Sequence, residues 1–89
     1  MKILSVCGNG LGSSLILKMA VEKVLKSENI KANVVVSDLG NAKGLDADYI
    51  VASPEIAERL KEHKATVIAI KNMMDKNEIK EKLISQINK

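Results

Sequence analysis

Residues 2–14 read KILSVCGNGLGSS, and this stretch decides the fold. An apolar run typical of a buried strand ends at Val6, and a glycine-punctuated turn starts at Cys7. A strand that passes through a tight loop directly into a helix is the opening unit of a parallel α/β sheet. The helix is predicted from Ser13 to about Ser27, because apolar residues recur there at helical spacing and form its buried face: Ile16, Leu17, Ala20, Val21, Val24 and Leu25.

Two more helices are indicated by their first residues. Ser53 and Pro54 are the residue types of a helix N-cap and of the first helical position. Asp75, with Glu78 three residues later, has the pattern of a capping box, and Ile79, Leu83, Ile84 and Ile87 are expected on the buried face of the helix that follows. Three further apolar runs are predicted strands: residues 33–37, 48–52 and 66–70.

The order of these elements predicts the fold class. Residues 38–44 contain two glycines and show no period, so we expect a loop there. The strands are continuously apolar, which is typical of a sheet with helices on both faces. We predict an α/β fold, a small doubly wound three-layer α/β/α domain with a four-stranded parallel sheet of order 2-1-3-4. Residues 1–89 are expected to form one domain, since a chain of 89 residues is too short for two.

The amino-acid composition argues against several classes of function. The chain has one tyrosine, Tyr49, and neither Phe nor Trp, which argues against nucleic-acid binding by base stacking. Its formal charge of +3 is spread along the chain, so a dedicated polyanion binder is not expected. A single cysteine cannot form an intramolecular disulfide, and no long apolar run is present, so we expect a cytoplasmic protein that does not insert into the membrane. Neither a heptad pattern nor a sustained exposed apolar stripe is apparent, so the oligomeric state is left open.

Polar residues follow each predicted strand, and the carboxyl ends of parallel strands share one edge of the sheet, where ligands bind. The residues predicted at this edge are Cys7, Ser37, Asp38, Ser53, Lys71 and Asn72. His63 is expected at the opposite edge, as a solvated side chain near a helix C-terminus. A catalytic pair of Cys7 and His63 is therefore not expected.

The loop after the first strand predicts a phosphate site with a nucleophile in it. Unpartnered backbone N–H groups at a glycine-rich loop and helix N-terminus attract a phosphate, and they also favour a cysteine thiolate. We predict Cys7 as the nucleophile. The predicted phosphate-binding loop consists of Gly8, Asn9, Gly10, Leu11, Gly12, Ser13 and Ser14. The alternative is a purely structural role, in which Cys7 is a buried cysteine beside a tight turn.

Other motifs match this loop less well. A Walker phosphate loop needs Gly-Lys-Ser/Thr where Ser13 stands, and a Cys-x-x-Cys redox site needs a cysteine at Gly10. The dinucleotide fingerprint is a weak match, because Ser13 replaces its last glycine. A low-molecular-weight cysteine phosphatase needs an arginine at Ser13 as its charge clamp, and the chain has no Asp-Pro pair to supply a general acid. A phosphoryl carrier, a phosphatase and a non-catalytic anion-binding regulator remain as hypotheses.

The loop Cys7 to Ser14, after the strand from Lys2 to Val6, resembles the phosphorylation loop of the B component (enzyme IIB) of the bacterial sugar phosphotransferase system. The L-ascorbate branch is the most similar, with a lysine soon after the loop, here Lys18, and Asn-Met after a short apolar strand, here Asn72-Met73. The resemblance implies that Cys7 accepts a phosphoryl group from a phosphohistidine of the A component. It then donates that group to a sugar bound by the membrane C component.

The same resemblance implies neither a cofactor nor a metal ion. Lys18 could favour an incoming anion, although a solvated helix lysine is an equally good interpretation. Asn72, Met73 and Met74 border the predicted edge and could help to dock protein partners, with one of the two methionines expected in the core.

Overall fold

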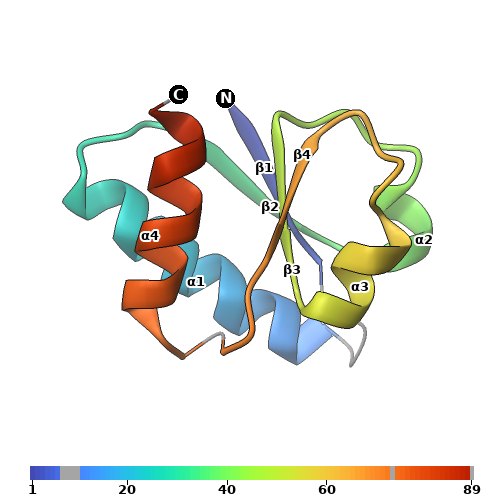
Figure 1. The fold of residues 1–89 in the computed structure, drawn as a ribbon, viewed down its shortest axis with the longest axis horizontal. Helices are drawn as coiled ribbons and strands as arrows, with labels where there is room; N and C mark the ends of the chain where they lie inside the picture. The colour runs from blue at the N-terminus through green and yellow to red at the C-terminus, as the bar shows by residue number, and fades with distance from the viewer. Residues whose placement is uncertain (7–10, 73, 89) are drawn as a thin grey trace.

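The structure is a computed structural model that describes residues 1–6, 11–72 and 74–88, with the backbone alone at residues 11–14. All four strands are parallel and lie in the order β2-β1-β3-β4, which confirms the predicted α/β class and strand order (Figure 1). The elements in chain order are β1 (Lys2–Val6), α1 (Leu11–Ser27), β2 (Asn33–Ser37), α2 (Leu39–Ala42), β3 (Tyr49–Ala52), α3 (Pro54–Arg59), β4 (Thr66–Ala69) and α4 (Lys76–Ile87).

Helices cover both faces of the sheet. In Figure 1, α1 and α4 lie on one side of the strands, and α2 and α3 lie on the other. Each face has its own apolar core, and successive strand residues alternate between the two: Ile3 packs with the α1 and α4 residues, whereas Leu4 and Val6 pack with Ile56 and Leu60 near α3. Because both cores need apolar side chains, the strands are continuously apolar rather than alternating.

Residues 38–44 differ from the expected loop, because they contain the four-residue helix α2. Asp38 caps this helix: its Oδ1 accepts a hydrogen bond from the backbone N–H of Asn41 at 2.7 Å. Ala42 at its end is fully buried against the second core. A helix of one turn shows no periodicity in sequence, and this is why the prediction was wrong.

The bounds of α1 lie close to those predicted from the sequence. Helix α1 begins at Leu11, two residues before the predicted start, and it ends as predicted at Ser27. Its C-terminus is closed by Asn29, which adopts a left-handed φ of 56°. The N–H of Ile30 donates to the carbonyl of Leu25 at 2.9 Å, and that of Asn29 donates to Lys26 at 3.1 Å, which is a Schellman motif.

The N-caps of the later helices differ in how their side chains act. Asp75 caps α4, and its Oδ1 accepts from the N–H groups of Asn77 and Glu78 at 3.0 and 3.2 Å. Ser53 occupies the N-cap position of α3 but makes no capping hydrogen bond with its side chain. None of the helices in the described ranges is both long enough and apolar enough to cross a bilayer.

Candidate functional site

The carboxyl ends of the four strands form one edge of the sheet. Val6 pairs in register with Ser37 on one side and with Ala52 on the other, and Ala52 pairs with Ala69. The strands therefore end in a single row, and the residues that follow them leave from the same edge. Figure 1 shows the first turns of α1, α3 and α4 gathered at this end of the sheet.

The chain reverses its winding between β1 and β3, which are neighbours in the sheet. From Val6 it passes to α1 on one face, and from Ala52 it passes to α3 on the other. In a doubly wound sheet this divergence is the place where ligands bind. Cys7 follows Val6 directly and Ser53 follows Ala52, so the sequence puts both residues next to this switch point.

The predicted nucleophile, Cys7, and three of the seven residues of its loop, Gly8, Asn9 and Gly10, lie outside the described residues. Leu11, Gly12, Ser13 and Ser14 form the first turn of α1, and their side chains are not described. The structure does locate the two ends of the loop, at the fully buried Val6 of the central strand β1 and at Leu11.

The start of α1 has the electrostatic character that the phosphate prediction requires. A helix leaves its first four N–H groups without helical partners, and its dipole is positive at that end. The first turn of α1 contains no acidic residue that would oppose an anion. An anion beside this turn would therefore be stabilised by the backbone.

Ser37 and Asp38, at the end of β2, are used in local structure. The Ser37 hydroxyl is buried and donates to the carbonyl of Asp38 at 3.0 Å. Both carboxylate oxygens of Asp38 accept hydrogen bonds from Asn41, one from its backbone and one from its side-chain amide at 3.0 Å. A surface cavity of about 520 Å³ adjoins these residues, but the carboxylate in its lining disfavours an anionic ligand.

The connection from β4 to α4 is held in place by Glu78, a role that the sequence analysis missed. Glu78 Oε2 accepts from the backbone N–H of Lys71 at 2.7 Å, and Oε1 accepts from that of Asn72 at 3.0 Å. It does not reach back to Asp75 as a capping box would. Lys82 Nζ donates to Glu78 Oε2 at 2.7 Å and to the carbonyl of Ala69 at 2.9 Å. A glutamate four residues before a lysine was the available signal, but it indicates only a helix ion pair.

These contacts change the acidity of Glu78. The hydrogen bond from Lys82 and those from the backbone N–H groups of Lys71 and Asn72 lower the pKa of Glu78 to about 2. The carboxylate is therefore charged at neutral pH. It ties the strand end, the connection and α4 together beside the candidate site.

His63 is not the solvated side chain that was predicted. It is partly buried, and its Nε2 lies 3.0 Å from the carbonyl oxygen of Ala42 and 2.9 Å from that of Leu45. Its Nδ1 accepts from the backbone N–H of Ala65 at 2.9 Å. Because Nδ1 accepts, Nε2 carries the hydrogen, and the ring links the end of α2 to the segment before β4. His63 thus precedes the amino end of β4, as expected, and its role is structural.

Several large apolar side chains are exposed, although the sequence indicated no sustained apolar stripe. They are Met1 before β1, Leu15, Ile16 and Met19 on α1, and Met74 before α4. Ile16 was predicted on the buried face. Met74 does not belong to the core, and Met73 lies outside the described residues. Lys18 is partly buried, and its suggested interaction with an anion stays a prediction.

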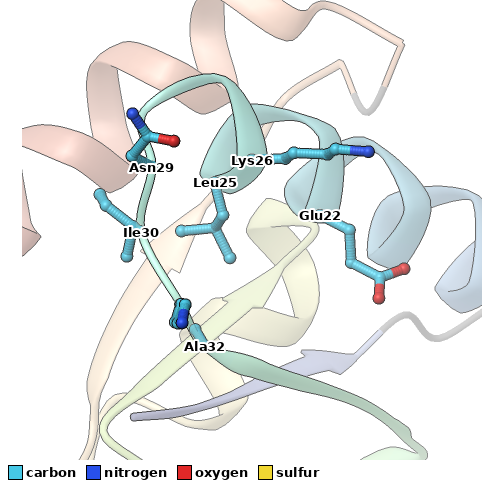
Figure 2. Close-up of a pocket in the computed structure, with 7 residues that line it drawn as sticks. Glu22, Leu25, Lys26, Asn29, Ile30 and Ala32 are labelled. Carbon is cyan, nitrogen blue, oxygen red and sulfur yellow. The ribbon is translucent and has the colours of Figure 1, made fainter.

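A second cavity lies at the opposite edge of the sheet, where α1 ends and the chain turns towards β2. Figure 2 shows its lining, in which the charged ends of Glu22 and Lys26 extend away from Ile30 and Ala32. Its volume is about 480 Å³. Its polar groups do not converge on a common point, so the carboxyl edge remains the better candidate for chemistry.

Comparison with known proteins finds relatives over nearly the whole chain. The family model described as "PTS system, Lactose/Cellobiose specific IIB subunit" matches residues 2–85. A Mycoplasma pneumoniae protein named "Ascorbate-specific PTS system EIIB component" is 37% identical over 84 residues, covering 91% of this chain and 88% of that protein. Proteins of the same name from Salmonella choleraesuis and Escherichia coli O157:H7 are 37% identical over 89 residues, covering 97% of this chain and 88% of each relative.

A solved structure is also similar. The crystal structure of a YwlE mutant from Bacillus subtilis matches with a TM-score of 0.63 at 14% sequence identity, covering 100% of this chain and 99% of that one. At this level of identity the likeness shows a shared fold and nothing about function. It agrees with the parallel four-stranded sheet described above.

Proposed function

This chain belongs to the family of phosphotransferase-system IIB subunits, and we propose that it carries a phosphoryl group on Cys7 during sugar uptake. Family membership supports a phosphoryl carrier of a sugar phosphotransferase system. The observation that supports the finer proposal is the position of the two elements that flank Cys7 in the chain. Strand β1, which borders the switch point, ends one residue before Cys7, and α1 begins four residues after it.

The proposed transfer has two balanced steps. In the first, the Cys7 thiolate attacks the phosphorus of a phosphohistidine on the A component; the S–P bond forms, the N–P bond breaks, and the imidazole nitrogen keeps the electron pair. In the second, a sugar hydroxyl attacks the phosphocysteine; the O–P bond forms, the S–P bond breaks, the thiolate is regenerated, and the hydroxyl proton passes to a base. The backbone N–H groups around the helix start stabilise the phosphoryl oxygens in both steps.

The residues of the loop favour a carrier over a hydrolase. The position that would hold a charge-clamping arginine in a cysteine phosphatase is Ser13. Without that guanidinium and without an Asp-Pro general acid, water is poorly activated against the phosphocysteine. The phosphorylated protein can then persist until it meets its acceptor.

The names of the relatives support L-ascorbate as the sugar, since those from Mycoplasma pneumoniae, Salmonella choleraesuis and Escherichia coli O157:H7 are called ascorbate-specific. We propose that the chain works in the cytoplasm, receives the phosphoryl group from an A component and donates it to a sugar held by a membrane C component. Neither a cofactor nor a metal ion is part of this proposal.

Intact-protein mass spectrometry tests the proposal. The chain is incubated with phosphoenolpyruvate, the general phosphotransferase proteins and an ascorbate-type A component, in parallel with the variants Cys7→Ser and Ser53→Ala. We expect one added phosphoryl group that depends on the A component and is absent in Cys7→Ser. Ser53→Ala, which changes a second nucleophilic side chain at the same edge, should still be phosphorylated.

The opposite results identify the competing functions. Turnover of p-nitrophenyl phosphate that requires Cys7 would indicate a cysteine phosphatase. Phosphate binding that survives Cys7→Ser, with no covalent adduct from the A component, would indicate an anion-binding regulator. Either result would overturn the carrier proposal.

A further inference from the structure

Helix α1 has two apolar faces, and only one of them is covered. Leu17, Val21 and Val24 on the first face pack into the core. On the outward face, Leu15, Ile16 and Met19 keep 50%, 46% and 51% of their surfaces exposed. Large apolar side chains that lie together at the surface mark contacts with other molecules more often than isolated ones do.

A groove runs beside this outward face. Its volume is about 190 Å³, and it lies between α1 and the connection from β4 to α4. Ile16, Met19 and Ala20 line it from α1, and Met74 lines it from the connection. Met74 is 73% exposed, which leaves the groove open to a partner. Methionine side chains adapt to the shape of a partner because they are flexible and polarizable.

Hydrogen bonds hold the backbone of Met74 at the groove. The N–H of Met74 donates to Oδ1 of Asn72 at 3.0 Å, and the N–H of Asn72 donates to Glu78 at 3.0 Å. Glu78 is itself paired with Lys82. The connection is thus tied to α4, so a partner meets a surface that is largely formed before binding.

The charges around the groove are basic. Lys23 and Lys76 belong to its lining. Within the described ranges, the ion pairs formed by lysines involve positions 61, 80 and 82 instead. Asp75, the nearest carboxylate in sequence to Met74, caps α4. Glu22 is the one acidic residue of α1, and it belongs to the cavity at the opposite edge.

We propose that the surface formed by Leu15, Ile16, Met19 and Met74, with Lys23 and Lys76 at its border, docks the protein that delivers the phosphoryl group. This inference rests on the proposed function. The partner presents apolar side chains to the groove and carboxylates to the lysines. A symmetric contact with a second copy would bring like-charged Lys23 and Lys76 side chains together, so charge complementarity favours an acidic protein partner.

The location of the surface suits this role. It covers the second and third turns of α1, and it reaches the connection that leaves the carboxyl edge after β4. A protein bound there is beside the edge from which the Cys7 loop starts. Docking at this place would bring a phosphohistidine near Cys7 without requiring a cavity deep enough to enclose it.

The test uses variants of the 89-residue chain. Met19→Asp and Lys23→Glu change the surface, whereas Lys64→Glu changes an exposed lysine before β4 and serves as the charge control. The initial rate of Cys7 phosphorylation is measured at a subsaturating concentration of phosphorylated ascorbate-type A component. We expect a fall of about tenfold or more for Met19→Asp and of about threefold for Lys23→Glu, with Lys64→Glu unchanged. Higher salt should lower the wild-type rate.

Two controls separate the effects of folding and of chemistry. Thermal unfolding and the rate of thiol modification by a small disulfide reagent should be the same in every variant as in the wild type. If Met19→Asp fails to fold, Lys23→Glu and Met19→Gln test the same surface with milder changes. If the wild type itself gains no phosphoryl group, the proposed function fails. If it is phosphorylated and both surface variants match its rate, the docking inference alone fails.

Other occupants of the surface give distinct results. Sedimentation with vesicles of phosphatidylglycerol and phosphatidylcholine that is lost in Met19→Asp, while phosphoryl transfer is unchanged, would identify a membrane contact instead. A wild-type dimer that dissociates in Met19→Asp without a change in transfer would identify a second copy of the chain. Each of these results would overturn the proposal.

Discussion

Glu78 offers a direct test of the contacts that hold the connection between β4 and α4. Replacing it by Gln keeps the size of the side chain and removes its charge. Glutamine has one oxygen and one NH2 group, so either the N–H of Lys71 or that of Asn72 loses its acceptor. The ion pair with Lys82 is also removed. We expect Glu78→Gln to lower the free energy of unfolding at neutral pH. Glu81, an exposed glutamate of the same helix, provides the matched control Glu81→Gln.

The size of the effect follows from the pKa of Glu78, which the contacts lower from 4.5 to about 2. A shift of this size corresponds to at most about 3 kcal/mol. The Glu78 side chain keeps 15% exposure and Lys82 keeps 40%, so solvent screening reduces the expected loss to about 1–2 kcal/mol. Because the folded pKa is the lower one, this stabilisation is complete above 4.5 and declines as the pH falls towards 2.

Urea unfolding followed by circular dichroism measures the difference between the wild type and Glu78→Gln. We expect a loss of about 1–2 kcal/mol near neutral pH that shrinks to less than half of this value at about pH 3, because the unfolded glutamate is then mostly protonated. Glu81→Gln should stay within about 0.5 kcal/mol of the wild type. A loss for Glu78→Gln that is equally small, or one that does not change with pH, would refute the assigned contacts.

Substitutions at two further positions test the hydrogen bonds of His63 and the C-terminal cap of α1. His63→Ala removes a ring that bonds to Ala42, Leu45 and Ala65, so thermal unfolding should show a loss of about 1–3 kcal/mol; no loss would mean that water replaces these bonds. Asn29→Val places a β-branched side chain at a φ of 56° and should cost about 1–2 kcal/mol, whereas Asn29→Gly should be neutral or slightly stabilising; equal melting temperatures for both variants would contradict the left-handed cap.

The fold could be predicted because its determinants are local and repeated. The apolar run at Lys2–Val6 and the helical spacing up to Ser27 are visible in any short window of the chain. The order of strands followed from the same elements, since short right-handed crossovers leave few arrangements for four parallel strands. Helix α2 was not predicted, because it is one turn long and depends on a single N-cap residue, Asp38.

The candidate site was predictable in part. Chain order alone places Ser37 at the end of β2, and Cys7, Ser53 and Lys71 after the other strands. The structure aligns the ends of these strands in one row. Cys7 and the first three residues of the predicted phosphate loop, Gly8 to Gly10, lie outside the described residues, so the chemistry of the loop is still a prediction from residue type and resemblance. Phosphorylation of Cys7 by an A component would test this predicted chemistry.

Sequence by itself determined the alternation of strands and helices, the apolar character of both sheet faces and the residues that leave the carboxyl edge. Only the tertiary structure decided that His63 bonds to the end of α2, that Glu78 holds the connection before α4, and that Ile16 and Met19 are exposed. Periodicity tells which residues share a helix face, because that depends on neighbours a few positions apart. Whether another element covers that face, or which distant backbone group a side chain reaches, depends on how the whole chain packs.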